Sequence, residues 1–123
     1  MKRTLASIVV AASIISPTAE TVAAMAAETT SAYINAITLL KICRSSDLTL
    51  QGECIGYIKG VSDRLDDVPA EQRKVCAPPG ITAGQLRDVV VRFLLRQNRT
   101  WQNNSGSSVV DVALRNAFPC KSS

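Results

Sequence analysis

The stretch from residue 78 to residue 97, PPGITAGQLRDVVVRFLLRQ, has the spacing of hydrophobic positions that is typical of an amphipathic helix. Its i, i+3, i+4, i+7 stripe consists of Leu86, Val89, Val90, Phe93 and Leu94. Just before that stripe, Thr82 and Gln85 have the spacing of a capping box, in which each side chain accepts a hydrogen bond from the other's backbone N–H. The pattern therefore predicts a helix from about Thr82 to Asn98.

Two apolar residues of the same segment, Val91 and Leu95, lie outside this stripe and form a second strip four residues apart. A helix that buries a single face has no need of this strip. One interpretation is a contact with another protein, either a second copy of the chain or a different partner. The other interpretation is that the last helix or the N-terminal segment covers both residues. The sequence leaves the two interpretations open.

Three more segments have helical periodicity, roughly from Thr30 to Cys43, from Glu53 to Val68 and from Ser108 to Phe118. Their apolar faces are predicted to consist of Tyr33, Ile37 and Leu40 in the first, of Cys54, Ile58, Val61, Leu65 and Val68 in the second, and of Val109, Val110, Ala113, Leu114 and Ala117 in the third. No segment has the two-residue alternation of a strand, and short connections make neighbouring helices antiparallel. We therefore predict an all-α fold, a small antiparallel four-helix bundle.

Gly56 and Gly60 stand four residues apart within the second predicted helix. Each glycine costs about 1 kcal/mol relative to alanine in a helix interior. We interpret the pair as a point where a neighbouring helix approaches closely. The alternative is a ligand that touches the bare backbone.

The first 26 residues have the pattern of a secretory signal peptide. A basic start, Met1-Lys2-Arg3, precedes an apolar run of about a dozen residues, which is shorter than the roughly 20 residues that span a bilayer. Alanine-rich cleavage options follow, which predicts cleavage at about residues 24–27 and a helical domain at residues 27–123. The alternative is a retained anchor helix. After cleavage we expect no contact with a membrane.

Four cysteines remain in the predicted domain, an even number that indicates two disulfides in an exported protein of this size. With antiparallel helices, Cys43 and Cys54 meet at one end of the bundle, and Cys76 and Cys120 meet at the other. Of the three possible connectivities, this geometry favours Cys43–Cys54 and Cys76–Cys120. There is no C-x-x-C motif and no histidine, so we predict neither a zinc site nor any cofactor.

Composition also narrows the function. The net charge of +4 is mild, and no aromatic residue is interleaved with a basic run, so nucleic-acid binding is not indicated. Without histidine, neither a Ser–His nor a Cys–His catalytic pair can form. The acidic cluster of Asp63, Asp66 and Asp67 has the spacing of a solvated helix face rather than of a catalytic pair. We therefore predict a binding protein and no enzymatic activity.

The candidate binding residues follow the second strip along the chain. Arg92, Arg96 and Arg99 recur at i, i+4 and i+7, which makes a basic stripe that could hold an acidic partner or simply face solvent. Trp101 lies in a polar segment, where it is either a binding hot spot or a lid on the core. The complete predicted partner-binding set is Val91, Arg92, Leu95, Arg96, Arg99, Trp101, Gln102 and Asn103.

Three blocks of the chain resemble the Rap/Tai family of type VI secretion immunity proteins. They are CIGYIKG at residues 54–60, CAPPGITAGQLRDVVVR at residues 76–92 and AFPC at residues 117–120. The resemblance extends over nearly all of the predicted domain, including residues 40–43. It implies a periplasmic helical protein of a Gram-negative bacterium that binds a peptidoglycan amidase toxin delivered by neighbouring cells and blocks its cleft. It also implies that a homodimer can form, with a loop that enters the active site of the toxin.

The chain departs from this family after the third predicted helix. A His-Pro pair and further histidines are expected there, but Gln97-Asn98 and Arg99-Thr100-Trp101 stand in their place. This region is therefore a candidate determinant of which toxin is recognised. The alternative function is that of a small periplasmic stress chaperone, which would open on acidification and expose apolar surface. Two disulfides would oppose such opening, and no histidine is present to switch near neutral pH.

Overall fold

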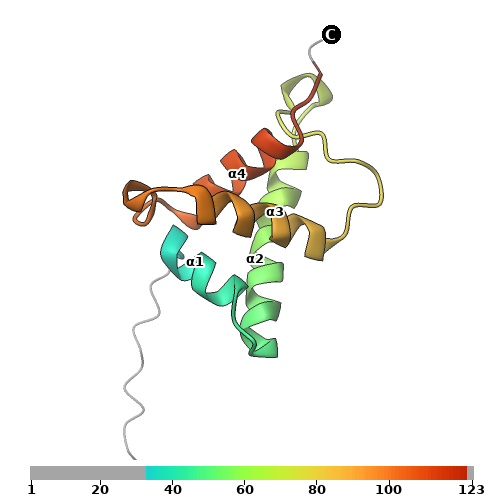
Figure 1. Ribbon diagram of the computed structural model, residues 1–123. Coiled ribbons are helices and arrows are strands. Elements are labelled where there is room, and N and C mark those ends of the chain that lie inside the picture. Colours follow the sequence, from blue (N-terminus) through green and yellow to red (C-terminus); the bar gives the residue numbers. More distant parts are fainter. Residues whose placement is uncertain (1–32, 122–123) are drawn as a thin grey trace, which may run out of the picture. The chain divides into compact units, whose positions relative to one another are not determined.

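The computed structural model describes residues 33–121 of the 123-residue chain, so the predicted signal peptide at residues 1–26 lies outside the described residues. The elements are α1 (Ala36–Cys43), α2 (Leu48–Asp66), the short 3-10 helix η1 (Ala70–Gln72), α3 (Ala83–Arg96), a second 3-10 helix η2 (Arg99–Trp101) and α4 (Gly106–Ala117) (Figure 1). Within residues 33–121 there is no strand, only two isolated bridges. The predicted all-α fold with four helices and two disulfides is confirmed.

Each of the four α-helices begins at a residue whose side chain caps it. The predicted capping box of Thr82 and Gln85 opens α3, with N–O distances of 2.8 and 3.2 Å. Three helix starts differ from the prediction, because Asn35, Asp47 and Ser105 cap α1, α2 and α4. The Asp47 carboxylate accepts from the backbone amides of two residues of the first turn at 2.8 and 3.1 Å, which starts α2 well before Glu53.

The four helices share one apolar core, and every pair of helices is in contact. The buried apolar residues are Ala36, Leu39, Ile42, Cys43, Cys54, Ile58, Leu86, Val90, Leu94, Val109, Val110, Ala113 and Leu114. The predicted stripe of α3 supplies three of these residues, while Val89 and Phe93 are partly buried against them. On α4 the predicted face is also buried, except for the exposed Ala117.

The predicted face of α1 is wrong for two of its three residues, since only Leu40 packs against the core, where it is partly buried. Tyr33 precedes the helix and is 83% exposed, and Ile37 is 49% exposed. The buried stripe is instead Ala36, Leu39, Ile42 and Cys43. Ile37 therefore lies on the outside of the molecule, at a place where a large apolar side chain has no role in the core.

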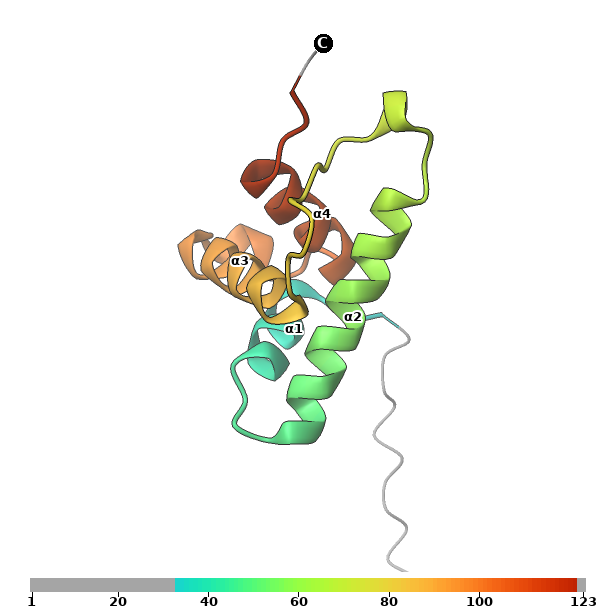
Figure 2. The ribbon, with the colours of Figure 1, turned by 90° about the vertical axis from the view of Figure 1, so that its right-hand side faces the viewer.

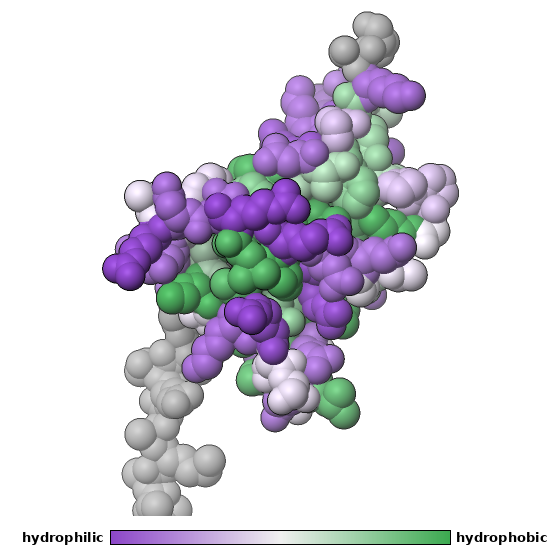
Figure 3. Space-filling view, in the orientation of Figure 1, coloured by the Kyte–Doolittle hydropathy of each residue, from purple (hydrophilic) through white to green (hydrophobic). Residues whose placement is uncertain are grey.

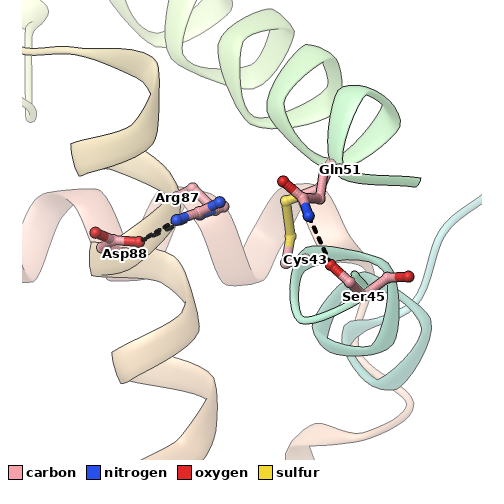
Figure 4. Close-up of a disulfide and its surroundings, with 6 residues drawn as sticks. Cys43, Ser45, Gln51, Arg87 and Asp88 are labelled. Carbon is pink, nitrogen blue, oxygen red and sulfur yellow. Dashed lines mark hydrogen bonds and ion pairs between the residues drawn. A yellow bond between two sulfur atoms is a disulfide. The ribbon is translucent and has the colours of Figure 1, made fainter. Parts of the chain in front are cut away.

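Both predicted disulfides form, Cys43–Cys54 and Cys76–Cys120. The first joins the end of α1 to α2 and lies in the core (Figure 4). Beside it, the Gln51 side chain donates to the backbone carbonyl of Ser45 at 3.0 Å, which holds the turn between the two helices. The second disulfide has an exposed cysteine, Cys76.

The segment between α2 and α3 runs past the end of α4 before it enters α3 (Figure 2). The backbone N–H of Cys76 donates to the carbonyl of Phe118 at 2.8 Å, and Val75 and Pro119 form an isolated bridge. The Cys76–Cys120 disulfide closes the same contact. The connection is therefore attached to the C-terminal end of α4.

The predicted close approach at Gly56 and Gly60 is also wrong. Both glycines are exposed, and a Cβ built on either would meet no atom within 4 Å. The close approach occurs at Gly106 instead, where a Cβ would lie 3.0 Å from the Ile34 carbonyl oxygen and 2.9 Å from Tyr57 Oη. The amide of Gly106 donates to that same carbonyl at 2.7 Å, which fixes the start of α4 against the residues before α1.

Because Gly56 and Gly60 have open space around them, replacing both by alanine is expected to stabilise the protein. The gain is about 0.5–1 kcal/mol per site, since alanine loses less backbone entropy in a helix interior. Urea denaturation measures it as a higher midpoint with an unchanged slope. Gly106→Ala is the matched comparison and is expected to destabilise, since its Cβ would lie too close to the Tyr57 side chain and to the Ile34 carbonyl oxygen. A lower midpoint for the Gly56 and Gly60 variants would contradict this assignment.

Candidate protein-interaction surface

The eight predicted partner-binding residues come from the last turns of α3, from η2 and from the turn that follows. The C-terminal end of α3 is closed by Gln97, whose side chain donates to the Phe93 carbonyl at 3.2 Å. The Asn98 side chain then accepts from the amide of Thr100 at 3.1 Å and starts η2. These two local contacts reverse the chain and bring η2 back against α3.

The reversal places Trp101 on Phe93. The two rings meet edge to face, with centroids 5.4 Å apart and planes at 86°. Trp101 is partly buried and packs against the core, as the lid interpretation requires. It also lines an open groove on the outside, so the hot-spot interpretation stays open.

The groove lies between α1 and the end of α3 and has a volume of about 250 Å³. Its lining residues are Ala36, Ile37, Leu40, Leu94, Leu95, Gln97, Asn98, Trp101 and Gln102. Three predicted residues, Leu95, Trp101 and Gln102, are therefore brought together here. Backbone bonds from the amides of Ala36 and Ile37 to the carbonyls of Asn104 and Gln102, at 2.9 and 3.4 Å, hold the two walls side by side.

Large apolar side chains reach solvent at this groove. Leu95 is 54% exposed and Ile37 is 49% exposed. Figure 3 shows an apolar patch over α1 and α3, with hydrophilic side chains on both sides of it. An apolar patch with a polar border is typical of a protein-binding surface.

The predicted second strip of α3 divides into two parts. Leu95 is exposed in the groove, whereas Val91 is partly buried and packs against the core. Val91 is therefore covered by the rest of the chain. For Leu95, a contact with another protein remains open. Arg92 faces a different hollow of about 550 Å³, which is lined by Pro78–Ile81 and Phe118, among others. Val91 and Arg92 are therefore not part of the groove.

The basic stripe is free of internal ion pairs within the described chain. Arg92, Arg96 and Arg99 are exposed, and none of them pairs with a carboxylate of residues 33–121. An i, i+4 pair of Asp88 with Arg92 is consistent with their spacing, but Asp88 pairs instead with its neighbour Arg87, at 2.9 Å (Figure 4). The guanidinium groups of the stripe are therefore available to a partner.

Sequence reasoning missed the whole wall that α1 supplies, which consists of Ala36, Ile37 and Leu40. It had assigned Ile37 and Leu40 to the apolar face of the first helix. The available signal was the excess of apolar residues in the segment AITLLKIC, where only Thr38 and Lys41 are polar. Such a segment has more apolar surface than one buried stripe can use. The surplus is on the groove side.

Other kinds of site receive no support from the described residues. Among residues 33–121, no group of three or more Cys, Asp or Glu side chains could hold a metal ion. In the same part of the chain, no helix has the length and apolar character needed to cross a membrane.

Comparison with known proteins gives one match. The family of Rap1a immunity proteins matches residues 35–120. No curated protein and no solved structure matches the chain. The matched range contains all four helices, both disulfides and the groove. The chain therefore belongs to the family of Rap1a immunity proteins.

Proposed function

We propose that this protein is exported to the periplasm, where it binds a peptidoglycan amidase delivered by type VI secretion and blocks the cleft of that enzyme. Membership of an immunity family, shown by the match over residues 35–120, is the observation that carries the proposal. Two disulfides support export, because such bonds persist in oxidising compartments. The exposed groove supports binding as the means of protection.

Export further requires that residues 1–26 act as a signal peptide. The chain purified from periplasm should then begin between about residues 24 and 28. N-terminal sequencing of the periplasmic form measures this directly. A chain that retains Met1 would contradict the proposal.

The direct test of the proposed function is inhibition of an amidase. We expect the open reading frame beside that of this chain to encode a small amidase with a Cys/His pair. That enzyme should lower the turbidity of a peptidoglycan suspension, and an equimolar amount of this protein should stop the reaction. The protein alone should leave peptidoglycan unchanged. Full amidase activity in the presence of a tenfold excess of this protein would overturn the proposal.

Trp101→Ala is expected to weaken binding to that amidase by about 30-fold, because truncation of a hot-spot tryptophan costs about 2 kcal/mol. Calorimetry on the purified pair measures the loss. The matched control is Phe93→Ala, which removes the other ring of the stacked pair but no lining of the groove. Urea denaturation of both variants separates affinity from stability. An equal loss of affinity in the two variants would show that Trp101 acts only through packing.

The chaperone alternative receives no matching support. An acid-opened protein needs groups whose protonation disrupts the core, but no charged side chain is buried within residues 33–121. A titration with a dye that binds apolar surface, from pH 7 to pH 2, tests this point. We expect no new dye binding while the disulfides are intact.

A further inference from the structure

The charges around the groove all have the same sign. The stretches of chain around its lining residues, residues 33–46 and 89–110, contain five basic residues and no Asp or Glu. Four of them, Lys41, Arg44, Arg96 and Arg99, lie near the groove along the chain, and the fifth, Arg92, faces the other hollow. All five are exposed. In contrast, residues 47–75 contain six acidic residues and only four basic ones. The positive charge of the described chain is therefore concentrated on the side of the groove.

Four of these cations stand next to the groove along the chain. Lys41 follows Leu40 and is one turn beyond Ile37, and Arg44 is one turn beyond Leu40. On the other wall, Arg96 follows Leu95 and Arg99 follows Asn98. Both walls of the groove are thus followed closely along the chain by exposed cations, and hydrophilic side chains border the apolar patch on both sides (Figure 3).

The size of the groove restricts what can enter. Its volume of about 250 Å³ lies below the roughly 300–1,000 Å³ of sites for small molecules. It suits a single apolar side chain. The Gln102 side chain is exposed at the rim and makes no hydrogen bond with a described residue, so its amide is available to a peptide backbone. The rim and the floor together match a protein segment rather than a metabolite.

We propose that the groove receives one apolar side chain from an acidic segment of the amidase, with carboxylates on both sides of that side chain bonded to Lys41, Arg96 and Arg99. The proposal rests on the proposed function, since the amidase supplies the segment. Charge complementarity is the argument for this occupant. A second copy of the chain is the weaker candidate, because a two-fold contact through this patch would bring two sets of like charges together.

A peptide titration tests the groove without the amidase. Trp101 is the only tryptophan, so its fluorescence reports occupancy. The probe is the blocked peptide Asp-Glu-Leu-Glu-Asp, for which we expect saturable binding. Binding should weaken at least tenfold when glycine replaces the leucine, or when the protein carries Arg96→Gln with Arg99→Gln. The matched control carries Lys59→Gln with Arg64→Gln, which removes the same charge from α2, and it should bind like the wild type.

Three results would overturn the proposal. They are equal binding of the peptide Lys-Arg-Leu-Arg-Lys, equal weakening by the α2 control, and a change of Trp101 emission with protein concentration alone, which would assign the groove to a second copy. Amidase inhibition separates this proposal from the function on which it rests. If the peptide binds in a way that depends on its leucine and its charge, but the protein does not inhibit the amidase, the proposed function fails and the groove proposal stands. If the Arg96→Gln, Arg99→Gln variant inhibits the amidase fully, the groove proposal fails and the proposed function stands.

Discussion

Replacing Cys43 and Cys54 together by alanine is expected to lower the free energy of unfolding by about 4–5 kcal/mol. Closing a ring over a separation of 11 residues contributes about 3 kcal/mol through the entropy of the unfolded chain. Both cysteines are also buried, so the loss of their sulfur atoms from the core adds about 1–2 kcal/mol. Small domains have a total stability of about 5–15 kcal/mol. The variant should therefore be close to unfolding at physiological temperature.

Urea denaturation, followed by circular dichroism, measures this change. The matched control is Cys76→Ala with Cys120→Ala, which opens a ring over a separation of 44 residues and should cost about 4 kcal/mol. The two double variants differ in the folded state. Only the first frees the end of α1, one wall of the groove, and should shift Trp101 emission to longer wavelength before unfolding. An unchanged midpoint, or the same emission shift in the control, would contradict the assigned role of the buried bridge.

The helices that could be predicted from the sequence are those with one clear apolar stripe. In α3, Leu86, Val90 and Leu94 recur every four residues, and the capping box marks the start of the helix. The disulfide pairing could also be predicted, because short connections make neighbouring helices antiparallel and bring Cys43 to Cys54. These features depend on residues close together in the sequence, and they can therefore be predicted from it.

The face of α1 could not be predicted in the same way. Six of its eight residues are apolar, so the periodicity does not distinguish the Leu39 face from the Ile37 face. The choice depends on tertiary contacts. Hydrogen bonds join Ala36 and Ile37 to Asn104 and Gln102, residues far along the chain, and they set the rotation of the helix.

Only the wall of the groove formed by the end of α3 and by η2 could be predicted in part, for the same reason. Leu95, Trp101 and Gln102 were identified because an apolar strip and a tryptophan in a polar segment are unusual locally. The wall opposite them is supplied by α1, and its position depends on the return of η2 against Phe93. The glycine pair shows that a local pattern can also predict a contact that the fold does not form. Gly56 and Gly60 have the spacing of a packing contact, but the close approach is at Gly106, where the start of α4 meets the Ile34 carbonyl.

Leu39→Ala and Ile37→Ala, two residues apart on α1, are expected to have opposite effects on stability and binding. Leu39 is 0% exposed, so its truncation should lower the free energy of unfolding by about 3–4 kcal/mol. In a domain of this size that corresponds to a fall in Tm of about 15 °C or more. Ile37 is half exposed, and its truncation should cost less than about 1 kcal/mol.

For inhibition of the amidase the ranking of the two variants should be reversed, with Ile37→Ala affected more than Leu39→Ala, provided that both variants are folded during the measurement. Leu39 touches no partner from within the core, so the folded Leu39→Ala variant should inhibit the amidase like the wild type at 15 °C. Ile37 supplies a wall of the groove, and its truncation should weaken inhibition about tenfold, or about 1.4 kcal/mol. Thermal unfolding and amidase inhibition, measured on the same preparations, give the two quantities. If Ile37→Ala loses stability but still inhibits the amidase fully, this face of α1 belongs to the core and the interaction surface lies elsewhere. A side chain that forms the wall against which the partner packs cannot be dispensable for binding that partner.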